Sequence, residues 1–110
     1  MAVTSAQEYF DTLDQRFVAS AAKGVKATFL FDLSGDGGGQ WHVVVTDGTM
    51  SVGAGAVDAP SCTIKMAAGD YVKLVNGQLN GMMAVMKGQM KVGGNVMLAK
   101  KMQDIFPIKK

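Results

Sequence analysis

The chain has 110 residues, of which 48% are hydrophobic and 18% are charged, and this composition predicts one folded domain, residues 1–110, with a single core. No apolar run approaches the roughly 20 residues that span a bilayer, and the acidic start MAVTSAQEYFD is unlike a signal peptide. One cysteine, Cys62, and one histidine, His42, exclude an internal disulfide and the usual zinc sites, and a reducing compartment fits best. We expect a cytoplasmic protein, and no metal or other cofactor is expected.

The first segment predicts an amphipathic helix. Ser5 and Glu8 have the spacing of a capping box, and the helical pattern continues towards Gly24. Apolar residues recur in this segment at helical intervals: Ala6, Phe10, Leu13 and Phe17. We therefore expect a first helix that buries one face.

Four strands are expected next, because apolar and polar residues alternate with the period of a half-buried strand. The alternating segments are residues 25–33, 41–46, 49–55 and 62–66. Residues 34–40, SGDGGGQ, predict a flexible hairpin loop between the first two strands. Asp47-Gly48 is a strong hairpin signal between the second and the third.

The second half of the chain predicts three short helices and a fifth strand. The expected helices cover residues 70–75, 82–87 and 96–106, and the expected strand covers residues 90–92. The predicted helix boundaries are Asn76-Gly77 and Pro107 as stops, Asn80 and Asn95 as N-caps, and Gly93-Gly94 as a tight turn. These elements predict an α+β domain, with helices over one face of a largely antiparallel sheet.

Motifs that carry chemistry are scarce. The sequence has no nucleophile elbow, no Cys-x-x-Cys, no His-Glu-x-x-His and no Walker A lysine. His42 is expected on the strand face opposite Trp41, as an ordinary surface histidine rather than a general base. The segment Gly93-Gly94-Asn95 allows two interpretations: a helix cap alone, or a cap whose backbone amides also meet an anion.

Methionine is concentrated in the C-terminal half. Seven of the nine methionines lie between residues 66 and 102: Met66, Met82, Met83, Met86, Met90, Met97 and Met102. Flexible thioether side chains suit a promiscuous apolar pocket, although a small core that uses methionine as filler is the alternative. Met82, Met83 and Met86 cannot all face one core from a single short helix, and glycines at 77, 81 and 88 bracket that helix. Both observations favour a pocket beside a movable helix.

Charge is distributed unevenly along the chain. The net charge is +2, but residues 87–110 carry six lysines against one acidic residue, Asp104. The lysines are Lys87, Lys91, Lys100, Lys101, Lys109 and Lys110. A solvated face is one interpretation, and transient attraction to an anionic membrane surface or a phosphate-bearing ligand is the other. Nucleic acid is not expected, because no aromatic residues alternate with these lysines and no nucleic-acid motif is present.

The stretch from Trp41 to Phe106 resembles the sterol carrier protein type 2 domain, a lipid-transfer module. SCTIKMAAGDYVKLVNGQLN is similar to the family's C-T-I-x-M strand, short helix and G-K-L-N-P, and AVMKGQMKVGGN is similar to A-F-x-x-G-K-L-K-I-x-G-N. LAKKM then matches L-A-x-K-L, and the upstream helix and strand fit more loosely. Gly81 stands in place of the usual proline and Val85 in place of the usual phenylalanine, and the end PIKK lacks a peroxisomal address.

The resemblance implies a five-stranded, mainly antiparallel sheet, covered on one face by about four to five helices and enclosing an apolar tunnel. It also implies non-catalytic binding and transfer of a fatty acid, fatty acyl-CoA, sterol or phospholipid. An accessory dimerisation or substrate-presenting module without lipid transfer is the alternative, an enzyme is not expected, and the oligomeric state stays open. We expect residues 77–95 to form a deformable lid and wall. The predicted lipid-binding residues are Phe17, Phe29, Phe31, Trp41, Val43, Met66, Leu74, Met82, Met83, Val85, Met86, Met90, Val92, Leu98, Met102, Ile105 and Phe106.

Overall fold

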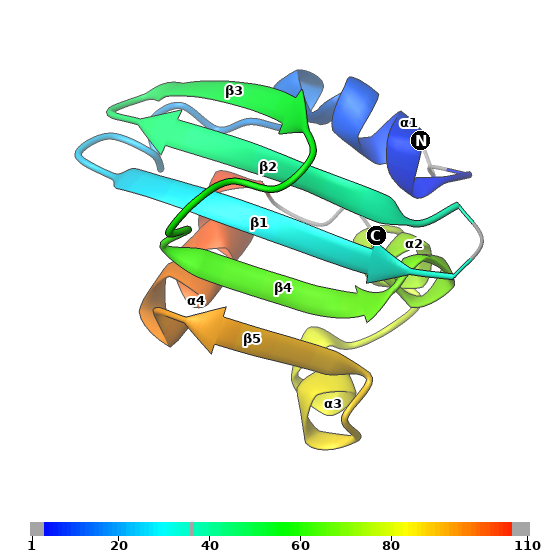
Figure 1. Ribbon diagram of the computed structural model, residues 1–110. Helices are drawn as coiled ribbons and strands as arrows, with labels where there is room; N and C mark the ends of the chain where they lie inside the picture. Colours follow the sequence, from blue (N-terminus) through cyan, green and yellow to red (C-terminus); the bar gives the residue numbers. More distant parts are fainter. Residues whose placement is uncertain (1–3, 36, 107–110) are drawn as a thin grey trace.

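A computed structural model describes residues 4–35 and 37–106, without the side chains of residues 96, 99 and 103. Its centre is a five-stranded sheet with the strand order β3-β2-β1-β4-β5 (Figure 1). The strands are β1 Lys26–Ser34, β2 Gly39–Thr46, β3 Thr49–Ala54, β4 Cys62–Ala67 and β5 Met90–Gly94. The predicted stop at Pro107 and the predicted membrane contacts of Lys109 and Lys110 lie outside the described residues.

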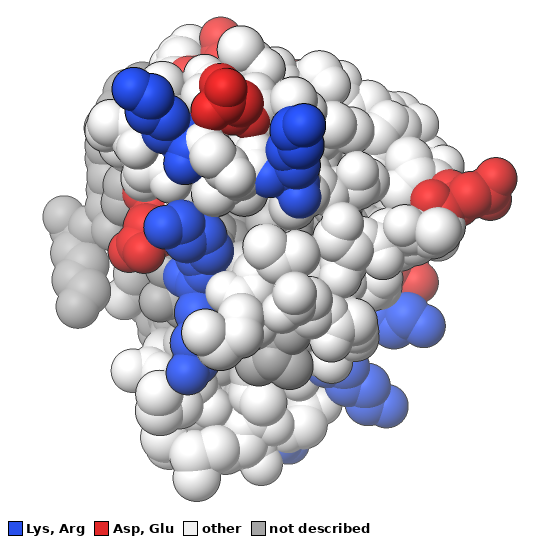
Figure 2. Space-filling model, turned by 90° about the vertical axis from the view of Figure 1, so that its left-hand side faces the viewer, with Lys and Arg blue, Asp and Glu red and all other residues white. Residues whose placement is uncertain are grey.

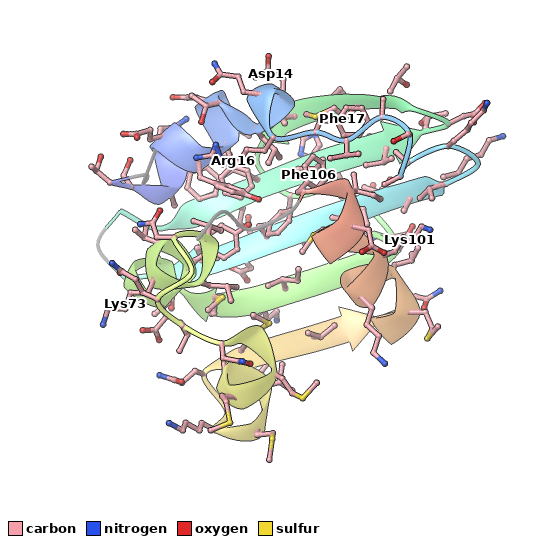
Figure 3. The ribbon with its side chains drawn as sticks, turned by 180° about the vertical axis from the view of Figure 1, so that it is seen from behind. Asp14, Arg16, Phe17, Lys73, Lys101 and Phe106 are labelled. Atoms are coloured by element: carbon pink, nitrogen blue, oxygen red, sulfur yellow. The ribbon has the colours of Figure 1, made fainter. Side chains whose placement is uncertain are left out.

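The sheet is mixed rather than wholly antiparallel. The pairs β1–β2, β2–β3 and β4–β5 are antiparallel, and β1 pairs with β4 in parallel. Residues 55–61 carry the chain across one face of the sheet, from the edge strand β3 to the far side of β1, and the helices cover the opposite face (Figures 1 and 3). The expected five-stranded, mainly antiparallel sheet is therefore confirmed, with one parallel pair.

The inward face of the sheet is a row of aligned apolar residues. In β1, residues 27, 29, 31 and 33 are buried and alternate with partly exposed neighbours, as the period of two predicts. Trp41 is paired with Phe31, Phe31 with Ile64, and Ile64 with Val92, so one row crosses from β2 to β5. Trp41, Phe31 and Ile64 are at most 6% exposed, whereas Val92 is only half-buried. The edge strand β5 thus has less cover than the centre of the sheet.

The helices are α1 Ala6–Asp11, α2 Ala68–Val75, α3 Gly81–Met86 and α4 Val96–Ile105, with a 3₁₀ turn η1 at Leu13–Gln15. Their predicted caps are confirmed. The Ser5 hydroxyl accepts a hydrogen bond from the backbone N–H of Glu8 at 3.1 Å. Asn80 caps α3, and Asn95 caps α4 through the N–H of Met97 at 3.0 Å. None of the described helices is long and apolar enough to cross a membrane.

Two predicted boundaries were wrong. The first helix ends at Asp11 instead of continuing towards Gly24, because tertiary contacts replace helical ones: Val18 donates its N–H to the Ile105 carbonyl at 2.8 Å, and Phe17 packs on Phe106 (Figure 3). Gly93 and Gly94 belong to β5 rather than to a turn, because they pair with β4. Gly94 has a φ of 79°, and a Cβ there would lie 2.6 Å from a backbone oxygen, so this position requires glycine.

An aromatic cluster fills the space between α1, α2 and the centre of the sheet. Phe10 stacks on Trp41 with ring centroids 4.7 Å apart, and it also contacts Phe31 and Tyr71 at 5.1 and 5.9 Å. Tyr9 meets Tyr71 edge to face at 5.2 Å. The β1–β2 part of the sheet is therefore covered by packed rings, and α1 closes that side of the molecule.

Candidate functional site

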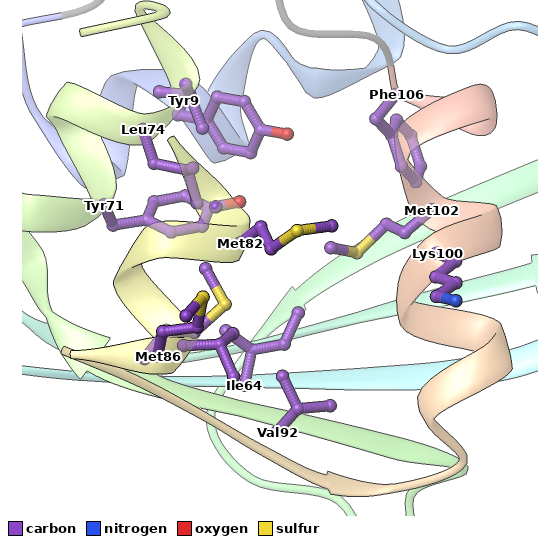
Figure 4. A pocket seen from close by; sticks show the side chains of 14 residues that line it. Tyr9, Ile64, Tyr71, Leu74, Met82, Met86, Val92, Lys100, Met102 and Phe106 are labelled. Atoms are coloured by element: carbon purple, nitrogen blue, oxygen red, sulfur yellow. The ribbon is translucent and has the colours of Figure 1, made fainter. Parts of the chain in front are cut away.

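An apolar cavity of about 390 Å³ lies between the helices and the β4–β5 edge of the sheet (Figure 4). Its size is near the lower end of the range for small-molecule pockets. Among the described side chains that line it, only two phenols and one ammonium group are polar. The lining residues are Tyr9, Ile64, Tyr71, Leu74, Val75, Gly81, Met82, Val85, Met86, Met90, Val92, Lys100, Met102 and Phe106.

The periodicity of each strand and helix determines which of its residues line the cavity. The floor is formed by Ile64 and Val92, which are paired in register on β4 and β5. The walls come from residues spaced by three or four positions on the helices, which places them on one helix face. These are Tyr71, Leu74 and Val75 of α2, Met82, Val85 and Met86 of α3, and Met102 with Phe106 at the end of α4.

The cavity has a closed end and an open end. Tyr9 and Tyr71, at the α1–α2 end, are 6% and 2% exposed. Met82 and Met86, on α3, are 73% and 75% exposed although both line the cavity. In Figure 4, Met82 points across the cavity towards Met102 on α4. The methionines of α3 therefore form a loosely packed rim, and the tyrosines form the inner wall.

Burial raises the pKa of both tyrosines. The pKa of Tyr71 lies well above its ordinary value because of desolvation and the neighbouring Tyr9. The pKa of Tyr9 is raised by desolvation, and a hydrogen bond with Tyr71 partly offsets this effect. Both phenols therefore stay protonated and neutral at physiological pH. The exposed Lys100 is the one cation among the lining residues that the structure describes.

The single histidine and the single cysteine of the chain, which are the usual candidates for catalysis, do not line the cavity. Nδ1 of His42 is 3.0 Å from the carbonyl oxygen of Gly55, on the sheet face opposite the cavity row, as predicted for a surface histidine. Cys62 is fully buried, and desolvation raises the pKa of its thiol, so the reactive thiolate is disfavoured. The described residues contain no cluster of three or more His, Cys, Asp or Glu side chains suited to a metal ion.

Eight of the predicted residues line the cavity, and the structure places nine away from its lining. The eight are Leu74, Met82, Val85, Met86, Met90, Val92, Met102 and Phe106. The other nine are Phe17, Phe29, Phe31, Trp41, Val43, Met66, Met83, Leu98 and Ile105. Six of these nine are buried in the packed core, since α1 and α2 already cover the centre of the sheet, and Met83 is 45% exposed on α3. The lipid contact of every residue in the set stays a prediction.

Six lining residues were missed: Tyr9, Ile64, Tyr71, Val75, Gly81 and Lys100. Two of them carried a readable signal. Ile64 shares the inward strand face with Cys62 and Met66, and Tyr71 shares a helix face with Leu74. No local pattern identifies Tyr9, because α1 meets α2 only in the tertiary structure.

The open end of the cavity belongs to a segment without negative charge. From residue 71 to residue 103 the sequence has five lysines and no aspartate or glutamate. Lys87, Lys91, Lys100 and Lys101 are all exposed. Figure 2 shows a face with several lysine and arginine side chains, a few acidic side chains and broad uncharged surface between them. The α3–β5–α4 edge therefore combines exposed apolar side chains with positive charge.

Comparison with known proteins agrees with this architecture. The model of the SCP-2 sterol transfer family matches residues 10–107. The chain belongs to this family. Human hydroxysteroid dehydrogenase-like protein 2 is 32% identical to it over 101 residues, which are 91% of this chain and 24% of that protein. The SCP-2 chain thus spans about a quarter of the length of such curated relatives.

Two solved SCP-2 structures share the fold along most of their length. The sterol carrier protein domain 2 of Helicoverpa armigera has a TM-score of 0.72 and 25% identity, and the match covers 88% of this chain and 81% of that one. Palmitated SCP2L2 from Aedes aegypti has a TM-score of 0.72 and 20% identity, and the match covers 94% and 96%. The α+β fold of this chain, with its five-stranded sheet and four α-helices among the described residues, is that of the SCP-2 domain.

Proposed function

We propose that the cavity holds the apolar part of one lipid molecule, and that the chain binds and transfers such lipids without catalysing a reaction. The observation that carries this proposal is an apolar cavity of about 390 Å³ with one open, methionine-lined end, in a chain of the SCP-2 family. A fatty acid or fatty acyl chain is the favoured ligand class among fatty acids, acyl-CoA, sterols and phospholipids. A relative of the same fold has been solved in a palmitated form, which supports this choice.

The free energy of such binding comes from apolar burial. Each methylene transferred from water into the cavity contributes about 0.8 kcal/mol. Ten buried methylenes therefore contribute about 8 kcal/mol before the cost of association, which is roughly 4–15 kcal/mol. Affinity should depend strongly on chain length, and polar contacts should set orientation more than strength.

The empty cavity has a free-energy cost that favours a movable lid. At about 24 cal/mol per Å³, a dry void of 390 Å³ would cost about 9 kcal/mol, which is comparable to the whole stability of a small domain. We propose that α3 closes over the cavity when no lipid is bound. Ala84 is the one buried residue of this six-residue helix, so α3 can shift without disturbing much of the core. Residues 77–95 would then act as a deformable lid and wall.

An anionic membrane surface is the proposed transient partner. Lys100 lines the cavity, Lys87 directly follows α3 and Lys91 lies on β5, and these lysines are exposed, as is Lys101 on α4. Each lysine near a negatively charged leaflet contributes about 1 kcal/mol, and this attraction weakens as salt is added. Vesicle binding of the chain should therefore fall with increasing ionic strength.

The remaining proposals concern the chain as a whole. We propose that it acts as one lipid-binding domain in the cytoplasm, where its buried cysteine stays reduced. Hydroxysteroid dehydrogenase-like protein 2 is about four times as long as the matched region, so its activity is not transferred to this chain. A bound lipid would be supplied by one membrane and released to another, or presented to a separate enzyme.

The proposal is tested by native mass spectrometry of the purified chain, followed by denaturation and lipid analysis of the released material. We expect one acyl-chain lipid per protein, or stoichiometric uptake when a fatty acid is added. A mass that stays bare with fatty acid, acyl-CoA and sterol would contradict the proposal. A mass that rises with protein concentration, without lipid uptake, would instead support the accessory module.

A further inference from the structure

We propose that Tyr9 and Tyr71 form a polar anchor at the closed end of the cavity, which binds one uncharged oxygen atom of an otherwise apolar lipid. The ligand class is a long-chain alcohol, or a lipid with an equivalent hydroxyl or carbonyl oxygen, held with this oxygen inwards. The inference rests on the proposed function, because it names the chemistry that the inner wall selects.

The geometry aims both phenols into the cavity. Tyr9 and Tyr71 are 94% and 98% buried, and both line the cavity. Their rings meet edge to face at 5.2 Å, and their hydroxyl groups share a hydrogen bond. In Figure 4 the two hydroxyl groups point in the same direction, towards the side on which Met102 and Phe106 lie.

The hydroxyl protons of Tyr9 and Tyr71 outnumber the hydrogen bonds that the two groups make with each other. Two phenols carry two hydroxyl protons, and their mutual hydrogen bond uses only one of them, whichever group donates. Both tyrosines line the cavity, and Figure 4 shows their hydroxyl groups on the cavity side of the rings. The second proton is therefore available to an acceptor inside the cavity. Burial raises the pKa of both tyrosines, so this proton stays in place throughout the physiological range.

The surroundings favour an uncharged acceptor. A carboxylate at the closed end would lose its hydration among apolar side chains, and the described residues that line that end include no cation to compensate it. Arg16 lies over the Tyr9 ring, with its Cζ 5.4 Å from the ring centroid, and it does not line the cavity. Lys100 is the cation of the lining and is exposed on α4. A fatty acid should therefore bind with its carboxylate towards Lys100, and a fatty alcohol with its oxygen towards the tyrosines.

Three ligands of equal chain length test this assignment: dodecanol, dodecanoic acid and chlorododecane. Their dissociation constants are measured by competition with a fluorescent fatty acid, for the natural chain, Tyr9→Phe, Tyr71→Phe, the double Phe variant and Lys100→Met. Phenylalanine keeps the ring packing and removes only the hydroxyl group. Thermal unfolding of each variant confirms that it is folded.

We expect each variant to weaken the binding of one ligand and to leave the binding of the others unchanged. In the double Phe variant dodecanol should bind about 3- to 10-fold more weakly, and chlorododecane should be unchanged. Dodecanoic acid should be unchanged in that variant and weakened by Lys100→Met. Equal dodecanol affinity in the natural chain and the folded double variant would overturn the anchor and leave lipid binding intact. Failure of all three ligands to bind the natural chain would instead overturn the proposed function.

Discussion

Two glutamate substitutions on α3 distinguish an effect on the cavity from an effect on the helix itself. Met86 lines the cavity, whereas Met83 does not. Both are exposed side chains of the same six-residue helix, at 75% and 45%. Met86→Glu and Met83→Glu therefore change charge and helix propensity in the same way, and only the first puts a carboxylate at the rim of the cavity.

The expected loss of affinity follows from the exposure of Met86. Removing its apolar contact with a bound chain costs about 0.8 kcal/mol for each methyl or methylene group. A carboxylate beside an apolar chain adds a desolvation cost, which is about 1–3 kcal/mol for a buried polar group. Because Met86 is 75% exposed, glutamate can turn partly into water, and the lower part of this range applies. We expect Met86→Glu to weaken lipid binding by about 1–2 kcal/mol, or about 5- to 30-fold.

The assay is a titration with a fluorescent fatty acid, supported by native mass spectrometry of the same samples. Met83→Glu should bind within about twofold of the natural chain, and Met86→Leu, which keeps the site apolar, should restore affinity. Thermal unfolding should be nearly the same for both glutamate variants, since both sites are exposed. Equal affinity of the two folded glutamate variants would remove α3 from the binding site.

Three further outcomes are expected. Gly94→Ala should destabilise the fold by about 1–3 kcal/mol in urea unfolding, because φ at Gly94 is positive and the new Cβ would clash with the backbone. Gly93→Ala should cost far less, because its new Cβ would lie 3.8 Å from the nearest atom, the Cβ of Thr63. Asn80→Ala should remove the cap of α3 and speed hydrogen exchange in that helix about fivefold, and unchanged exchange would refute the role of the cap. The raised pKa values of Tyr9 and Tyr71 favour the neutral phenols in the folded state, so their contribution to stability is complete below pH 10 and is lost as the pH rises through their folded pKa values. Urea unfolding at pH 8 to 11 should show a smaller alkaline decline in the double Phe variant.

Local pattern in the sequence was enough to predict the strands and most of the helix boundaries. Alternation placed Phe29 and Phe31 on the inward face of β1, and the side chains of Asn80 and Asn95 capped the helices as expected. These features depend on neighbours within a few residues, such as the side-chain oxygen of Asn80, which accepts hydrogen bonds from the backbone N–H groups of Met82 and Met83. Short-range geometry of this kind is contained in the sequence itself.

Which of the inward-facing residues line the cavity was decided by the tertiary structure. Phe31 and Val92 lie in the same inward row of the sheet, so their sequence patterns look alike, yet Phe31 is core and Val92 is cavity floor. The difference is what covers them: Phe10 packs on Phe31, whereas the cover over β5 is the loosely packed α3. The end of the first helix was also decided at long range, by the bond from Val18 to Ile105. Periodicity determines which side chains point inwards, and only the packing of distant helices determines whether they meet other side chains or a cavity.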